Sequence, residues 1–305
     1  EYGAHYAWTP KEIDHKVQDA MGKTYDGVAG DMLDVMPTVE RILAESASEP
    51  DLEPVFDNRE PEPKGSGLRP VYKIGERLGL VRPSWRVQGM LRENSIAVLF
   101  GESGSRKTWI ALDLALSIAT GLPFLGCFPV KKGRVFYIIS EGADDFDMRA
   151  EAWARAKGVR LKDIESFYYL PSNYNFGDAA HVDWAVAEIG QRMDGVDVVF
   201  VDTLSRNILG DTDSNETMNG CYNNLDQLRQ RLQAMVLMVH HTGWGNVHRE
   251  RGARCLRDNC DTSIRIERDG MQSTIACMKQ RMGTEFAPID VGFSLVRLPD
   301  LDTTE

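Results

Sequence analysis

The sequence predicts an α/β fold: a parallel sheet flanked by helices, antiparallel strands at its C-terminal end, and a small helical segment before it. Apolar runs of strand length alternate with stretches of helical length, which is typical of strands buried on both faces. A hairpin signal at Asp269-Gly270 follows the last alternation. The expected parallel strands are residues 95–100, 134–140, 167–170, 196–202 and 236–240, and the expected helices are 107–121, a stretch ending at 153, 182–193 and 218–233. The expected hairpin strands are 263–268 and 273–279, with a final strand at 292–298.

Composition divides the chain into three parts. Residues 1–48 are expected to form a helical segment, because Thr9, Pro10 and Glu12 together are a strong helix start signal. Residues 49–70 are rich in proline and acidic residues and read as an exposed linker. Residues 71–305 hold the whole α/β pattern and are expected to form one domain.

Charge and cysteine content exclude several classes of protein. The formal net charge of the 305 residues is −11, so any nucleic-acid contact would need a local basic patch. The five cysteines include no CxxC pair, which favours reduced thiols over a disulfide framework or a zinc site. No apolar run approaches the roughly 20 residues of a membrane helix.

A phosphate-binding loop follows the first apolar strand and opens the first helix of the α/β pattern. Glycines allow close wrapping around phosphates, Lys107 would reach the β- and γ-phosphates, and Thr108 would ligate Mg²⁺. Arg106 stands where the motif usually has glycine, and we expect this to be tolerated if its φ is helical and its side chain points outward. A chance match of an ordinary loop is the alternative. The octamer is Gly101, Glu102, Ser103, Gly104, Ser105, Arg106, Lys107 and Thr108.

Polar residues end three other strands. Asp202 is the candidate for organising Mg²⁺, and Glu141 is the candidate general base for an attacking water. The alternatives are an ordinary strand-end acid and an acid near a helix start. His240 and His241 end a further strand, where a polar side chain can sense the γ-phosphate; a structural histidine or a metal ligand are the other interpretations.

In this order, the motifs resemble those of RecA-like ATPases of the plasmid RepA and DnaB-type hexameric replicative helicase family, in a phage or mobile-element member. The resemblance covers about residues 83–298. It rests on the octamer, Glu141, the Asp202-Thr203-Leu204-Ser205-Arg206 string, His240-His241-Thr242-Gly243, the stretch from Arg251-Gly252 to Asp261, and Lys279-Gln280-Arg281-Met282-Gly283.

The resemblance implies a RecA-like P-loop core in a ring, usually a hexamer, with ATP held between subunits. Lys107, Thr108, Asp202 and Glu141 would act within one subunit, with ATP and Mg²⁺ as cofactors, and His241 would relay the state of the γ-phosphate. Lys279, Arg281 and Arg251 would reach the neighbour's nucleotide. A solvated strand edge is the alternative for Lys279 and Arg281.

A basic stretch at residues 244–257 suits single-stranded DNA, because arginines can follow the backbone while an aromatic ring stacks on bases. Ion pairs at a subunit interface are the alternative for any one arginine. The polar stretch 210–219 is expected to be a loop and a poor phosphate binder. The candidate DNA-binding residues are Trp244, Arg249, Arg254 and Arg257.

The function expected from these features is an ATP-dependent DNA helicase or translocase of phage or plasmid replication, in the cytoplasm of a bacterial host. A RecA/RadA-like recombination ATPase and a nucleotide-gated loader with weak hydrolysis are the alternatives. Residues 8–21 also resemble the last helix of primase modules, which suggests a fused or associated primase.

Overall fold

The computed structural model describes residues 84–212, 214–241, 256–281 and 283–298, together with the short stretches 5–7 and 73–74. The expected helix at Thr9 and the linker at 49–70 lie outside the described residues, so the three-part division of the chain stays a prediction. No helix in the described part is long and apolar enough to cross a membrane.

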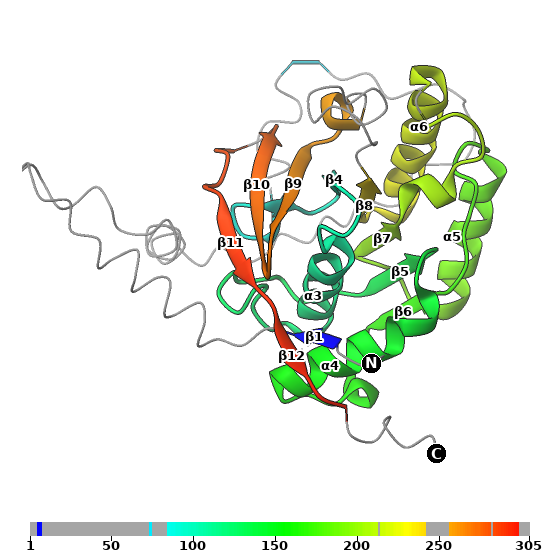
Figure 1. Ribbon diagram of the computed structural model, residues 1–305. Coiled ribbons are helices and arrows are strands. Elements are labelled where there is room, and N and C mark those ends of the chain that lie inside the picture. Colours follow the sequence, from blue (N-terminus) through cyan, green and yellow to red (C-terminus); the bar gives the residue numbers. More distant parts are fainter. Residues whose placement is uncertain are drawn as a thin grey trace, which may run out of the picture. The chain divides into compact units, whose positions relative to one another are not determined.

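The core is one eight-stranded sheet in the order β11-β10-β9-β4-β8-β7-β5-β6 (Figure 1). Strands β4 to β9 pair in parallel, whereas β10 joins β9 and β11 joins β10 in antiparallel fashion. The predicted fold class is therefore confirmed. The strands are β4 Ile96–Gly101, β5 Val135–Ile139, β6 Phe167–Leu170, β7 Val198–Asp202, β8 Met235–His241, β9 Thr262–Asp269, β10 Gln272–Gln280 and β11 Ile289–Gly292.

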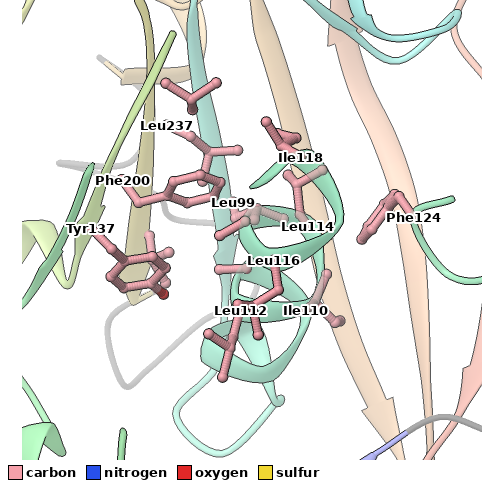
Figure 2. Close-up of a cluster of buried hydrophobic side chains, with 14 of the residues drawn as sticks. Leu99, Ile110, Leu112, Leu114, Leu116, Ile118, Phe124, Tyr137, Phe200 and Leu237 are labelled. Carbon is pink, nitrogen blue, oxygen red and sulfur yellow. The ribbon is translucent and has the colours of Figure 1, made fainter. Parts of the chain in front are cut away.

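Helices cover both faces of this sheet. The helices are α3 Lys107–Thr120, α4 Phe146–Lys157, α5 Ala180–Arg192 and α6 Asn215–Leu232. Side chains of α3 and α4 pack on the face that includes Leu99, Tyr137 and Phe200, and Figure 2 shows the turns of α3 beside these residues. Side chains of α5 and α6 pack on the opposite face with Val98 and Met238. Successive strand residues point to opposite faces, so one apolar run supplies both cores.

Local sequence signals set the ends of the helices. Helix α3 stops where Gly121 adopts a left-handed conformation with φ 83° and donates its N–H to Ser117 O. Ser214 caps α6 by accepting a hydrogen bond from Thr217 N, so α6 begins at Asn215. The expectation of a loop over 210–219 is wrong for its second half, because this cap starts the helix inside the polar stretch.

The C-terminal strands also differ in detail from the prediction. The hairpin loop is Gly270-Met271 rather than Asp269-Gly270, because Asp269 still pairs with Gln272. The expected strand at 292–298 is two strands, β11 and β12 Ser294–Val296, with Phe293 between them. Strand β12 pairs with β1 His5–Ala7, and two more short strands, β2 Trp85–Val87 and β3 Leu91–Arg92, pair with each other. These short strands carry too few residues for a recognisable sequence pattern.

Candidate nucleotide-binding site

Strand β4, a glycine-containing loop and the start of α3 form the expected strand–loop–helix unit. A Cβ on Gly101 would lie 2.2 Å from Ile266 O of the neighbouring strand β9, so only glycine fits there. Gly104 has a φ of 77°, in the left-handed region that favours glycine. The helix that follows presents its first backbone N–H groups to the loop, which is the usual setting for phosphate binding.

Arg106 is the residue that departs from the usual motif. Its φ is 70°, so the expectation of a helical φ is wrong. A left-handed residue with a side chain costs about 1–2 kcal/mol. The side chain does point outward, as expected: its Nη2 donates to Gly270 O at 3.0 Å, and its guanidinium lies 4.5 Å from the centre of the Phe293 ring. These contacts offset part of the strain.

Lys107 is buried under the loop that precedes it. Its Nζ donates to Gly101 O at 3.0 Å, to Glu102 O at 2.7 Å and to Ser105 Oγ at 3.3 Å. Burial lowers the pKa of Lys107 to about 8, although the nearby carboxylates of Asp202 and Glu141 oppose that shift. The amine is therefore already largely removed from water, and phosphate oxygens are stronger acceptors than the carbonyls that it now contacts.

Asp202 lies at the end of β7, fully buried behind Thr108. Thr108 Oγ1 donates to Asp202 Oδ1 at 3.3 Å, and Tyr137 OH donates to the other oxygen at 2.7 Å. Burial raises the pKa of Asp202 to about 6, although these two hydrogen bonds and Lys107 lower it. The carboxylate is thus fixed on both oxygens and joined to the hydroxyl that opens α3.

Glu141 and His241 face each other across the ends of β5 and β8. His241 Nε2 lies 3.5 Å from Glu141 Oε2, and Thr203 Oγ1 donates to the same carboxylate oxygen at 3.4 Å. Burial and the charge of Lys107 lower the pKa of His241, while Glu141 raises it. His240 points to the other face, where burial lowers its pKa to about 4. No cluster of three or more metal-ligating side chains occurs among the described residues.

These groups surround one cavity of about 480 Å³. Its walls come from the loop, the start of α3, and the ends of β5, β7, β8 and β9, which meet at one edge because the strands are parallel. The lining residues are Ser103, Gly104, Arg106, Lys107, Thr108, Trp109, Glu141, Gly142, Arg149, Thr203, His241 and Arg268.

Two arginines of the cavity wall were missed by the sequence analysis. Arg149 lies on α4, stacks 5.3 Å from the centre of the Trp109 ring and approaches Asp145 within 3.7 Å. Arg268 ends β9 and donates through Nη1 to Gly104 O at 3.3 Å. The one available signal for Arg149 was its position, two helical turns after Glu141.

The cavity residues fit a nucleoside triphosphate and its magnesium ion. The volume lies within the range of about 300–1,000 Å³ that is typical of small-molecule sites. Oxygen ligands suit Mg²⁺, and Thr108 and Asp202 supply a hydroxyl and a carboxylate at the start of α3. Lys107, Arg149 and Arg268 supply positive charge for phosphates. Asp202 itself does not line the cavity, so its contribution would pass through Thr108 or a water molecule.

Lys279 and Arg281 lie away from this cavity. Strand β10 runs antiparallel to β9, so its last residues reach the edge of the sheet opposite to the phosphate loop. There, Lys279 Nζ donates to Arg257 O at 3.0 Å and to Asp258 O at 2.7 Å. Arg281 pairs with Asp261 at 2.9 Å. Both side chains thus hold the helical turn at 256–259, which is a structural role that the sequence did not predict.

The predicted residues of the basic stretch are mostly beyond the described part of the chain. Trp244, Arg249, Arg251 and Arg254 lie outside the described residues. Arg257 is described, and its Nε lies 3.9 Å from Asp258. The roles of these residues toward DNA or a neighbouring subunit stay predictions.

The fold and the site together define the class: a P-loop, RecA-like ATPase domain. Residues 77–247 match the family of AAA domains, and because this match spans more than half of the chain, the chain belongs to that family. Among solved structures, it is similar to the ATPase domain of a DnaB-like helicase, with a TM-score of 0.51 and 11% identity over 67% of this chain and 85% of that chain. Such a likeness shows the shared fold alone. No curated protein sequence matches the chain.

Proposed function

We propose that this protein hydrolyses ATP and uses the energy to move along or unwind DNA, as a helicase or translocase in phage or plasmid replication. One observation carries the hydrolysis: Lys107, the Thr108–Asp202 pair and Glu141 come from separate strand ends and meet at one cavity. A loop that matched the phosphate motif by chance would not have these partners.

The side chains divide the chemistry between them. Lys107 and Arg149 bind phosphate oxygens and stabilise the negative charge that develops during phosphoryl transfer. Thr108 and Asp202 hold the magnesium ion, which neutralises phosphate charge when bound. Glu141 is half exposed at the cavity wall and accepts a proton from the attacking water, while Thr203 and His241 hold its carboxylate.

Coupling to DNA is supported more broadly. The AAA-domain family and the fold shared with the helicase ATPase domain favour a nucleotide-driven machine over a simple hydrolase. We propose that subunits assemble in a ring, likewise inferred from the motif resemblance, with Lys279, Arg281 and Arg251 acting toward a neighbour and the 244–257 stretch contacting single-stranded DNA. The place of action would be the cytoplasm of the bacterial host, where an associated primase would cooperate.

Two substitutions test the hydrolytic site. In ATPase assays with Mg²⁺, Glu141→Gln is expected to lower kcat by about 10²–10⁴-fold and leave nucleotide binding nearly unchanged, because only the general base is lost. Lys107→Ala is expected to weaken nucleotide binding itself. Glu165→Gln, at an exposed position away from the cavity, is the matched control. Full turnover in Glu141→Gln would remove the general-base assignment.

The motor function needs two further measurements. Turnover is expected to rise when single-stranded DNA is added, and strand separation is expected to require ATP. Nucleotide binding without DNA-stimulated turnover would support the loader instead. The mass of the assembly with ATP and Mg²⁺ tests the ring, and a strict monomer would contradict the roles of Lys279 and Arg281 toward a neighbour.

A further inference from the structure

Three side chains fasten the phosphate loop to the β9–β10 hairpin. Arg268 Nη1 donates to Gly104 O at 3.3 Å, and Ser273 Oγ donates to Ser105 O at 3.3 Å. Arg106 makes the third connection, from the loop outward, through its hydrogen bond of 3.0 Å to Gly270 O at the hairpin turn. The loop is therefore attached to a second part of the sheet as well as to β4 and α3.

Arg106 makes the most extensive of these connections. Besides Gly270 O, its guanidinium approaches Gln272 O at 3.5 Å and Met271 Sδ at 3.5 Å, and it lies over the ring of Phe293. The backbone of Arg106 is left-handed, a conformation that glycine adopts without strain. The arginine thus replaces a residue that suits the backbone with one that suits the hairpin.

We propose that Arg106 is a positioning residue that anchors the phosphate loop to the β9–β10 hairpin and to Phe293, and so holds the loop in its nucleotide-accepting conformation. This inference rests on the proposed ATP-binding function. Glycine at the same place would leave the loop free to sample other conformations, and the apparent affinity for a ligand falls with the fraction of molecules in the competent conformation.

The anchor also couples the loop to the hairpin turn. The hairpin turn holds Met271, which is half exposed. A displacement of this turn moves Gly270 O, which pulls on Arg106 and shifts the first residue before Lys107. Phe293 fixes the other side of the guanidinium from the junction of β11 and β12.

The first experiment measures the binding of magnesium-ATP to the full 305-residue chain by calorimetry. Arg106→Gly and Arg106→Ala are both expected to bind about tenfold more weakly, since the loss of hydrogen bonds and one cation–π contact is comparable to a tenfold change. Arg160→Ala, a mostly exposed arginine paired with Asp163 away from the site, is the control and is expected to bind as the unchanged chain does.

Thermal unfolding separates positioning from general damage. Arg106→Gly is expected to melt at a higher temperature than Arg106→Ala, because glycine relieves the left-handed strain, and yet to bind no more tightly. A damaged fold would lower stability and affinity together. Binding by Arg106→Gly as tight as that of the unchanged chain, or tighter, would overturn the proposal.

A double-mutant cycle with Phe293→Leu tests the partner. If Arg106 acts through Phe293, Phe293→Leu weakens binding, and adding it to Arg106→Ala weakens binding little further. Fully additive effects would show that Arg106 acts on the nucleotide directly and would overturn the proposal. Lys107→Ala, measured in parallel, reports on the proposed function alone: if it binds magnesium-ATP normally, the ATP site is misassigned whatever Arg106 does.

Discussion

Replacing Asp202 by asparagine is expected to make the empty protein more stable while abolishing its magnesium-dependent ATPase activity. The carboxylate is fully buried, and burial raises its pKa from 3.8 to about 6. The difference between these pKa values corresponds to about 3 kcal/mol of folding free energy. Asparagine keeps an acceptor for Thr108 and can donate to the hydroxyl of Tyr137, so it removes the charge with little change in shape.

The effect has a defined pH dependence. Because the folded protein binds the proton more tightly, the stability that the protonated carboxyl contributes is fully present below pH 3.8 and is lost as the pH rises through about 6. Asp202→Asn avoids this loss. Allowing for imperfect hydrogen bonds, we expect it to gain about 1–3 kcal/mol at pH 7.5, or roughly 2–10 °C in melting temperature, and about half of that gain at pH 5.

The assay is thermal unfolding at both pH values, without nucleotide or Mg²⁺, beside steady-state ATP hydrolysis. Asp194→Asn, an exposed aspartate between α5 and β7, is the matched control and is expected to change stability by less than about 0.5 kcal/mol. A variant of Asp202 that is less stable than the unchanged chain at pH 7.5, or equally stabilised at both pH values, would refute the reasoning.

Two other predictions concern buried hydrogen bonds. Tyr137→Phe removes one of the two bonds that hold Asp202, so we expect several-fold more Mg²⁺ to be needed for half-maximal turnover, with ATP affinity in the absence of Mg²⁺ unchanged; an unaltered Mg²⁺ requirement would count against it. Trp153→Phe removes the 2.6 Å bond from its indole to buried Asp113 and is expected to cost about 2–4 kcal/mol in urea unfolding, whereas exposed Trp184→Phe should cost less than about 0.5 kcal/mol; equal losses would contradict the reasoning.

Much of the architecture could be predicted because each element has a local signal. Strands buried on both faces are continuous apolar runs, and the run at 167–170 coincides with β6. Their polar end residues identified Lys107, Asp202 and Glu141 as neighbours, since parallel strands end at a common edge. The structure bears out that these residues lie together; what each does with a nucleotide remains to be tested by substitution.

The rest depends on contacts between distant parts of the chain. Nothing local to β8 reveals that it lies between β4 and β7, where His241 comes to face Glu141. The φ of Arg106 is set by a hairpin more than 160 residues later in the sequence, at Gly270. Tyr137 reads as one more apolar strand residue until its hydroxyl is seen to meet Asp202.

The same burial acts on both charges at the heart of the site, and this gives the empty site its character. Burial lowers the pKa of Lys107 to about 8 and raises that of Asp202 to about 6, so each charged form is disfavoured although the two oppose each other's shift. Exposed residues at these positions would lose their water only on binding, and that desolvation would weaken affinity. Here folding has already removed the water. Lys107 and the Thr108–Asp202 pair are therefore prepared for phosphate and metal before either arrives, at the expense of stability in the empty protein.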